Sequence, residues 1–513
     1  MNKHVPIALA VLSGVLYFVG FIGFDQWYLA WIALAPLLMA LSGIETGRRA
    51  FLISWLMGWV THLGGYYWTV QLFVEFGQLP LPVAVLSYAA LCAFQGGQFA
   101  VFGYLAWMLA RKTPLSIGWS APIALIAAEF IYPLIFPSYT ANSQAWNPLL
   151  IQIVDLGGVL LLSGVIALVN GSVADVAVAM MKRRPIPRAL PIAALSALAL
   201  AIGYGAWRMP QFDARDRAAA QLKVAIVQAN VGESNKHLNV AEGTALYRAM
   251  TDAAMDAAGV GLVAWPESAL NQFVGLNENL SGQVASEVKT PMIVGALRAG
   301  TDPISGQGKY WNSILALRPG GDIVGNYDKV KLLAFGETLP GYEWFPGMWN
   351  WALKLGVLPF SEVFTAGASY APLPVGPYRI SADVCYEDIL PAHMRRLMSA
   401  ADERGMRPHA MFNGTNDSWY GPVEPRIHLA LSVFRAVEHR RWLIRSTATG
   451  ISAFVDSNGR VVERSEFERE QTLIRDVPMI EAGPTVYGVV GDALGWLALI
   501  FIGGVVVSAR RRG

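Results

Sequence analysis

Charged residues are distributed very unevenly along this chain, and that distribution constrains the fold more than any other feature of the sequence. Of the 39 basic and 37 acidic residues, 16 fall within residues 1–208, and the other 60 fall within the remaining 305 residues. A stretch of about 200 residues with so few charges cannot cover itself with an ordinary solvated surface. We therefore predict that the first part of the chain lies in a membrane and that the later part forms a water-soluble domain.

Eight apolar stretches in the sequence are long enough to cross a bilayer, for which a helix needs roughly 17–25 mostly apolar residues. The sixth stretch contains several glycines and is also compatible with one helix plus an interfacial piece. The first is also compatible with a cleaved signal peptide, but a short link leads directly into the next stretch and favours an uncleaved helix. The stretches are 5–22, 27–43, 50–73, 82–109, 116–136, 150–180, 189–207 and, after a long polar interval, 487–508.

Basic residues alternate between the loops that join these stretches. The loops at 23–26, 74–81 and 137–149 contain no Lys or Arg, whereas the alternate loops and both ends are basic. Because cytoplasmic loops hold an excess of Lys and Arg, we predict an eight-helix membrane protein with both termini in the cytoplasm. The soluble domain then lies in the periplasm or its equivalent. The predicted domains are a seven-helix part at 1–207, the soluble domain at 208–486, and a final helix with a basic tail at 487–513.

Composition excludes several classes of protein. The net charge of +2 is small and the basic residues form short clusters, so no nucleic-acid partner is predicted. Two cysteines cannot form a disulfide framework, no histidine lies in a metal-binding repeat, and no phosphate-binding glycine loop is evident. No metal or cofactor is therefore predicted. Glu129 and Asp155 lie in or beside apolar stretches, but neither has a catalytic partner in the sequence, and we favour a structural role for both.

The soluble part alternates short apolar runs with helical patterns. Runs typical of buried strands lie at 222–227, 260–265, 291–295, 313–317 and 379–384. This alternation is typical of a layered α/β domain, in which functional residues gather at strand ends. We therefore expect catalytic residues close behind such runs.

Three strand ends are followed by residues that can carry out catalysis. Glu267 follows one run, Lys329 and Glu337 bracket an apolar segment, and Cys385 follows another run. An isolated glutamate or lysine is more often a helix cap or a solvated charge. Cys385 carries more weight, because the other cysteine, Cys92, lies in the fourth apolar stretch and cannot plausibly pair with it. A single thiol in an oxidising compartment favours a nucleophile over an inert buried cysteine.

Glutamate, lysine and cysteine together form a complete set for acyl transfer. A free thiol has a pKa of about 8.5 and is mostly protonated at neutral pH, so a carboxylate base is needed to form the thiolate. A nearby ammonium favours that anion. With a backbone N–H after the cysteine, it also stabilises the oxyanion of a tetrahedral intermediate.

The order of these motifs resembles the Glu-Lys-Cys triad of the nitrilase superfamily. Residues 265–267 read Trp-Pro-Glu, Lys329 is followed by Phe-Gly-Glu at 335–337, and residues 385–387 read Cys-Tyr-Glu. With seven apolar stretches before this domain and one after it, the whole chain resembles the apolipoprotein N-acyltransferase family. Later segments similar to superfamily motifs lie at 416–421, 434–441 and 448–450.

This resemblance implies an αββα sandwich that faces the periplasm from the inner membrane of a Gram-negative bacterium. It implies transfer of an acyl chain from a membrane phospholipid, through a cysteine thioester, to the N-terminal amine of a diacylglyceryl-cysteine apolipoprotein. By the same resemblance, Glu267 is the general base, Lys329 the oxyanion stabiliser and Cys385 the nucleophile. The matching supporting positions are Glu337, Tyr386 and Glu387.

The segment 338–372, between Glu337 and the strand before the cysteine, is rich in large apolar side chains. Such residues usually form a core, but aromatic side chains also favour membrane interfaces and line lipid sites. We therefore predict a lid or a membrane-dipping arm. His237 stands where some relatives carry Trp, which leaves the role of that position open. The lid candidates are Trp344, Phe345, Trp349 and Trp351.

Two other functions remain open at this point. A membrane-tethered amidase of the nitrilase type would use the same three residues, although eight apolar stretches exceed what an anchor needs. A transporter or scaffold with a ligand-binding outer domain is disfavoured by the few intramembrane charges and by the lack of an evident inverted repeat. A long-chain acyl thioester on Cys385 would separate the acyltransferase from both.

Overall fold

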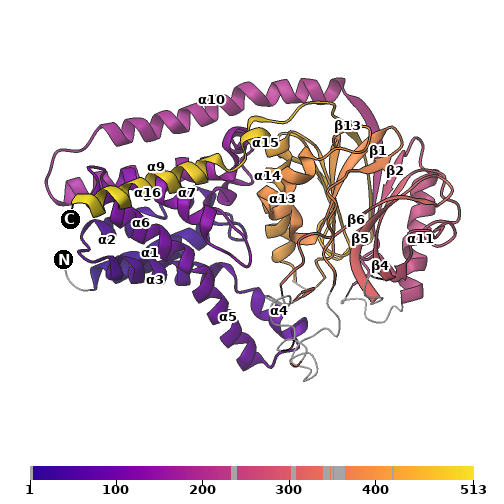
Figure 1. The fold of residues 1–513 in the computed structure, drawn as a ribbon, viewed down its shortest axis with the longest axis horizontal. Coiled ribbons are helices and arrows are strands. Elements are labelled where there is room, and N and C mark those ends of the chain that lie inside the picture. The colour runs from indigo at the N-terminus through magenta and orange to yellow at the C-terminus, as the bar shows by residue number, and fades with distance from the viewer. Residues whose placement is uncertain are drawn as a thin grey trace. The chain divides into compact units, whose positions relative to one another are not determined.

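The chain divides into two compact units in a computed structural model (Figure 1). The first, which we call the helical unit, comprises Met1–Phe73, Pro80–Gln211 and Thr485–Gly513. The second, the α/β unit, comprises Val74–Leu79 and Phe212–Pro484. The structure describes residues 4–232, 240–301, 308–334, 336–338, 347, 351, 364–418 and 421–512.

Helices of the helical unit agree only in part with the eight predicted apolar stretches. The longer helices are α1 (Val5–Gly20), α3 (Gly47–Gly65), α5 (Leu81–Gln95), α6 (Gly97–Lys112), α7 (Ile117–Ile131), α9 (Val154–Met181), α10 (Ala189–Ala218) and α16 (Ala493–Arg512). The shorter ones are η1 (Trp27–Trp31), α2 (Ala35–Ser42), α4 (Thr69–Glu75), η2 (Thr140–Gln144), α8 (Pro148–Ile151) and α15 (Val486–Val490). Four helices among the described residues are long and apolar enough to cross a membrane, namely Leu81–Lys112, Val154–Met181, Ala189–Ala218 and Ala493–Arg511.

The second predicted stretch, 27–43, does not form one spanning helix. It forms the 3-10 helix η1 and then α2, which has eight residues and is therefore about 12 Å long. Pro36 lies in the first turn of α2, where its ring and its missing N–H are tolerated, so the proline suits the start of a new helix at this point. Hydropathy alone therefore overestimates the length of helix here.

The glycine-rich sixth stretch is interrupted, as its composition indicated. The short helix α8 precedes α9, and inside α9 the backbone leaves helical geometry at Gly157 and Gly158. Gly158 has a φ of 66°, which favours glycine, and a Cβ at this position would lie 2.6 Å from the Tyr487 ring. The kink thus lets α9 pass close to the segment that leads into α16.

Glu129 and Asp155, for which the sequence favoured a structural role, have polar partners within the helical unit. Glu129 Oε1 accepts hydrogen bonds from the backbone N–H and the hydroxyl of Thr140, each at 2.7 Å. Asp155 Oδ1 accepts a hydrogen bond from the Tyr204 hydroxyl at 2.8 Å. A buried carboxyl group is costly unless it is hydrogen-bonded. These contacts support the structural role that we favoured for both residues.

Two sheets lie between helices in the α/β unit, which gives four layers (Figure 1). The seven-stranded sheet has the order β13-β1-β2-β4-β5-β6, with β3 paired to β4, and α11 covers its outer face. The six-stranded sheet has the order β12-β11-β10-β9-β8-β7, and α13 and α14 cover its outer face. This arrangement is the predicted αββα sandwich.

The strands of the first sheet are β1 (Ala220–Gln228), β2 (Leu262–Ala264), β3 (Leu270–Val274), β4 (Met292–Thr301), β5 (Gly308–Leu317), β6 (Ile323–Asp328) and β13 (Gln471–Met479). Those of the second sheet are β7 (Leu373–Val375), β8 (Tyr378–Val384), β9 (Ala410–Thr415), β10 (Leu443–Thr447), β11 (Ala453–Val455) and β12 (Val461–Arg464). The associated helices are α11 (Val240–Asp256), the 3-10 helix η4 (Cys385–Ile389), α13 (Pro391–Ser399) and α14 (Glu424–His439).

Parallel strands at the centre of each sheet bring functional residues to the same edge. Strands β1, β2 and β4 run parallel, and so do β8, β9 and β10. The carboxyl ends of such strands are where open α/β sheets place their sites. Glu267 follows β2, and Cys385 directly follows β8. The sheets also pack closely against each other, because a Cβ on Gly414 of β9 would lie 2.9 Å from Ile314 of β5.

Candidate active site

Charged side chains from the seven-stranded sheet form one contact group. Lys329, directly after β6, places its Nζ 2.8 Å from Glu337 Oε2 and 3.6 Å from Glu267 Oε1. Asn312 on β5 donates from Nδ2 to both carboxylates, at 2.6 Å to Glu267 and 2.8 Å to Glu337. Glu267 Oε2 also accepts a hydrogen bond from the backbone N–H of Asn416 at 2.9 Å. One ammonium and one amide therefore hold two carboxylates side by side.

Burial and mutual charge set the proton affinities of this group. Burial raises the pKa of Glu267, the Lys329 ammonium opposes that rise, and the Glu337 carboxylate adds to it. Burial disfavours the charge of Lys329, but Glu337, Glu267 and the Cys385 thiolate outweigh it and hold the pKa of the lysine well above its usual value. Glu267 can therefore accept a proton while Lys329 stays cationic, which suits a site for proton transfer.

Cys385 lies at the sharp turn between β8 and η4, in the six-stranded sheet. Its φ is 56°, a left-handed conformation that is uncommon for a residue with a Cβ. Burial raises the pKa of its thiol well above the usual range, and Glu267 adds to that rise, whereas the Lys329 charge and a hydrogen bond with Thr415 lower it. The resting thiol is therefore protonated at neutral pH and needs a base before it can attack.

Glu387 connects the loop after Lys329 to the cysteine turn. Its Oε1 accepts hydrogen bonds from the backbone N–H groups of Val330 and Lys331, at 2.8 and 2.6 Å. Its Oε2 accepts one from the N–H of Val384, the residue before the cysteine, at 2.9 Å. Burial raises the pKa of Glu387 to about 7, against the Lys329 charge and these N–H donors. One buried carboxyl group thus sets the spacing between the two halves of the site.

Tyr386 contacts the same loop from the other side of the turn. Its hydroxyl donates to the carbonyl oxygen of Leu332 at 2.9 Å. Its ring centroid lies 5.6 Å from Lys329 Nζ, within the range of a cation–π interaction. Tyr386 therefore helps to hold the ammonium group in place.

A buried polar network lies behind the cysteine turn. Asn413 on β9 donates from Nδ2 to the Cys385 carbonyl oxygen at 2.9 Å and to Asp383 Oδ1 at 2.6 Å. Its Oδ1 accepts a hydrogen bond from Arg445 Nη1 at 2.8 Å, and the same nitrogen donates to Asp388 Oδ2 at 2.9 Å. Neither Asn413 nor Arg445 has any exposed surface. The guanidinium fixes the orientation of the Asn413 amide, and that amide fixes the Cys385 carbonyl.

Three groups of the types that bind metals lie at the far side of this network. Ligand-type atoms of Asp417, Glu424 and His428 lie within 4.8 Å of one another. However, Arg445 Nη2 is already 3.3 Å from Asp417. Burial and Arg445 lower the pKa of His428, but Asp388 and Asp417 outweigh them and raise it to about 10. A protonated imidazole has no lone pair for a metal. Arg445 and the protonated His428 are the cations that balance these carboxylates.

The structure places the predicted triad and its three predicted supporting residues at one site. Sequence reasoning missed Asn312, Asn413 and Arg445. The arginine had a detectable signal, since a charged residue that directly follows the apolar run 442–444 needs a buried partner if the strand continues through it. The two asparagines had none.

Most of the predicted lid segment lies outside the described residues. Trp351 is described and is 64% exposed. The prediction of a lid or membrane-dipping arm at 338–372 therefore stays a prediction. The predicted positions outside the described residues are Trp344, Phe345, Trp349 and His237.

An αββα sandwich with a carboxylate, an ammonium and a buried thiol at its strand ends is typical of a nitrilase-type domain, and this chain also carries apolar helices. Residues 223–487 match the carbon-nitrogen hydrolase family, and residues 13–172 match the N-terminal domain of apolipoprotein N-acyltransferase. The solved structure of Nit3 from Saccharomyces cerevisiae, a member of branch 10 of the nitrilase superfamily, matches with a TM-score of 0.36 and 18% identity, covering 50% of this chain and 90% of that chain.

Two relatives match along almost the full length of the chain. The apolipoprotein N-acyltransferase of Geobacter metallireducens is 31% identical over 513 residues, covering 98% of this chain and 94% of that protein. The apolipoprotein N-acyltransferase of Bdellovibrio bacteriovorus is 29% identical over 540 residues, covering 99% and 94%. The chain belongs to the apolipoprotein N-acyltransferase family.

Proposed function

We propose that this protein transfers an acyl chain from a membrane phospholipid to the N-terminal amine of diacylglyceryl-cysteine apolipoproteins, with Cys385 carrying the chain as a thioester. Family membership supports the overall reaction. The observation that carries the mechanism is that Lys329 contacts both Glu267 and Glu337. The charges of Lys329 and Glu267 also shift the pKa of the Cys385 thiol.

In the first half of the reaction, Glu267 takes the proton of the Cys385 thiol as the sulfur attacks the ester carbonyl carbon of the phospholipid. The carbonyl oxygen becomes an oxyanion, which the Lys329 ammonium stabilises. When the bond to the glycerol oxygen breaks, Glu267 returns the proton to that oxygen and a lysophospholipid leaves. The raised pKa of Glu267 favours each of these proton transfers at neutral pH.

In the second half, the neutral amine of the apolipoprotein attacks the thioester carbon. Glu267 accepts a proton from the attacking nitrogen, and Lys329 again stabilises the oxyanion. The carbon–sulfur bond then breaks, and the proton on Glu267 passes to the departing sulfur, which restores the thiol. Base and acid roles therefore alternate on one carboxyl group in a ping-pong scheme.

The supporting residues act through the triad. Glu337 holds the lysine Nζ at 2.8 Å, and Tyr386 presents its ring to the same ammonium. Glu387 ties the lysine loop to the cysteine turn through backbone N–H groups. We expect variants at these positions to affect the geometry of the site more than the proton transfers themselves.

The proposed topology has eight membrane spans, with the divisions 1–207, 208–486 and 487–513. It places both termini in the cytoplasm and the catalytic domain in the periplasm of a bacterial inner membrane. The alternation of basic loops supports this orientation. In intact spheroplasts, a membrane-impermeant thiol reagent should label cysteines introduced near 23–26 and 137–149 but not near 184 or 511. Labelling at 184 from outside would overturn the orientation.

Intact mass spectrometry of the purified protein with phospholipid tests the reaction most directly. A mass increase equal to one long acyl chain, mapped to Cys385 and removed by adding a diacylglyceryl-cysteine peptide, is the expected result. Formation of the thioester without transfer to that peptide would contradict the proposed acceptor. Turnover of small water-soluble amides with no acyl-enzyme would favour a membrane-tethered amidase instead.

A further inference from the structure

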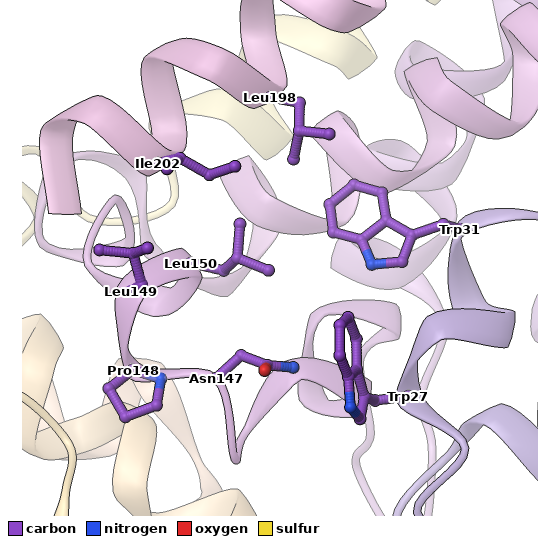
Figure 2. A pocket seen from close by; sticks show the side chains of 8 residues that line it. All are labelled: Trp27, Trp31, Asn147, Pro148, Leu149, Leu150, Leu198 and Ile202. Atoms are coloured by element: carbon purple, nitrogen blue, oxygen red, sulfur yellow. The ribbon is translucent and has the colours of Figure 1, made fainter. Parts of the chain in front are cut away.

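An open cavity of about 440 Å³ lies in the helical unit, on elements that carry none of the residues assigned to catalysis (Figure 2). This volume falls within the range of small-molecule sites, roughly 300–1,000 Å³. Its wall comes from three places in the sequence that are distant from one another, namely η1, the segment around α8, and α10. The lining residues are Trp27, Trp31, Asn147, Pro148, Leu149, Leu150, Leu198 and Ile202.

The lining changes in character from one end of the cavity to the other. Figure 2 shows Leu198 and Ile202 of α10 on one side, and Trp27, Asn147 and Pro148 on the opposite side. Asn147 provides the one charged or amide side chain of the wall, and its Nδ2 donates to Gln144 Oε1 at 3.2 Å. The cavity is therefore apolar along most of its length, with an amide and an indole at one end.

Helix α10 cannot move inward to close this cavity. A Cβ on Gly205 would lie 2.0 Å from the carbonyl oxygen of Leu149, so α10 and the start of α8 already touch at the backbone. The hydroxyl of Tyr204 donates to Asp155 Oδ1 at 2.8 Å and fixes the same turn of α10 to α9. Leu198, which lines the cavity, lies seven residues before Gly205 and thus about 10 Å along the same helix.

The cavity lies close to the expected boundary between hydrocarbon and headgroups. Arg208 is the first charged residue of α10, and it follows Ile202 by six residues, about 9 Å along the helix. Trp207 and Tyr204 stack near the Arg208 guanidinium, at 5.2 and 5.9 Å from their ring centroids. Aromatic and basic side chains of this kind mark the interface of a membrane protein.

We infer that this cavity binds one acyl chain of a phospholipid, with the ester end of the chain beside Trp27 and Asn147 and its methylene groups against Leu198 and Ile202. Water gains little in the apolar part, because the side chains of Leu149, Leu150, Leu198 and Ile202 offer it no hydrogen-bond partner. A saturated chain meets only apolar side chains there, and its ester oxygens meet the indole and amide groups. The bound chain would fill the space between α10 and the rest of the helical unit. It would act as a resident lipid rather than as a substrate, so the inference does not depend on the proposed reaction.

Photo-crosslinking with a defined probe tests this site. The full-length chain carrying Cys385→Ala, which cannot consume the probe as an acyl donor, is placed in phosphatidylglycerol and phosphatidylethanolamine vesicles. These contain a phosphatidylethanolamine with a diazirine within one acyl chain. After irradiation, peptide mass spectrometry locates the adducts. We expect adducts on residues 147–150 and 198–202 to exceed those on the neighbouring lipid-facing surface of α10.

Two matched variants separate a specific site from general contact with lipid. Leu198→Trp fills the cavity with an indole, whereas Leu195→Trp adds the same side chain at a position on α10 that is 67% exposed and does not line the cavity. We expect Leu198→Trp to lower the adducts at 147–150 to the level of the general surface and Leu195→Trp to leave them unchanged. Equal adduct yields in both variants, with unchanged thermal unfolding midpoints, would overturn the inference. So would adducts spread evenly around α10 in the parent protein, which would indicate non-specific lipid contact only.

Discussion

At the seven-stranded sheet, the charged side chains of the candidate site lie on loops that follow the strands, and they contact one another. At the six-stranded sheet, the thiol belongs to a residue with a left-handed backbone, and a buried polar network contacts that backbone. Lys329 contacts Glu267, and Asn312 donates hydrogen bonds to both Glu267 and Glu337. Cys385 is supported through its backbone carbonyl. The first arrangement lets protons move among carboxyl and ammonium groups. The second has fixed charges that balance and do not need to change during the reaction.

This difference indicates how the two halves divide the work of the site. Groups that exchange protons must have proton affinities that neighbours can adjust, and charges placed side by side achieve that. A nucleophile needs a constant position, since small displacements of a reacting atom are costly in rate. Substitutions in the first sheet should therefore affect mainly chemistry, and substitutions in the network should affect mainly stability.

The largest expected effect is at the nucleophile. Cys385→Ala removes the atom that carries the acyl chain, so intact mass spectrometry should detect no acyl-enzyme and no product. The matched control is Cys92→Ala, which removes the other free thiol, in the helical unit. That variant should form the acyl-enzyme normally. Acylation that persists in Cys385→Ala would move the nucleophile to another residue.

The next largest effect is on stability. Arg445→Met removes one of the two cations, Arg445 and His428, that lie against the buried carboxylates of Asp388 and Asp417, and breaking one side of a buried ion pair costs about 3–5 kcal/mol. The thermal unfolding midpoint of the α/β unit should fall strongly. Arg318→Met is the control, because Arg318 and Asp322 form an exposed pair, whose loss costs at most about 1 kcal/mol. Similar midpoints for the two variants would contradict the role of the network.

The third effect is on rate. Glu267→Gln removes the base and Lys329→Met removes the charge that stabilises the oxyanion, so each should slow acyl-enzyme formation by about 10²-fold or more. Pre-steady-state mass spectrometry would measure that step. If the two sheets differ in this way, Glu267→Gln should lower the thermal unfolding midpoint less than Arg445→Met does. Normal thioester formation in Glu267→Gln would mean that another group is the base.

The smallest effect is on pH dependence. The folded-state pKa of Glu387, about 7, lies above its ordinary value of 4.5. Its protonated form therefore contributes stability that is present below about pH 4.5 and is lost as the pH rises through about 7. Glu387→Gln lacks this titration. Its unfolding midpoint should accordingly fall less between about pH 5 and pH 8 than that of the parent protein. Unfolding midpoints that change equally with pH in the parent protein and in Glu387→Gln would contradict a pKa of Glu387 raised by burial.

The sequence predicted which residues gather at the candidate site, and part of that prediction follows a simple rule. Glu267 and Cys385 each come after an apolar run, and parallel strands bring such ends to one edge. Lys329 was predicted with Glu337 from the apolar segment that the two residues bracket and from the resemblance to the nitrilase superfamily. Asn312 lies in the middle of β5 instead, where a single sequence does not distinguish a ligand of two carboxylates from an ordinary strand residue. The Asn413 contact with the cysteine carbonyl requires the exact pairing of β8 with β9, which apolar patterns do not specify.

The membrane part was predicted less well, for a related reason. Hydropathy reports how apolar a segment is, but the start and end of each helix depend on prolines, glycines and tertiary packing. Residues 27–43 are apolar throughout, yet they divide into η1 and α2. The kink at Gly157 and Gly158 was foreseeable from composition, but its closeness to Tyr487 was not, because that contact joins segments more than 300 residues apart.

The left-handed backbone of Cys385 also bears on how sequences of this kind evolve. A side chain in that conformation stores strain that glycine would not, so the residue that we propose as the nucleophile occupies a position where the sequence is less stable than the fold permits. A glycine there would relieve the strain and, under the proposed mechanism, leave no thiol to form the thioester. At this position, selection for activity therefore opposes selection for stability. Stabilising substitutions that preserve activity have to arise elsewhere in the chain.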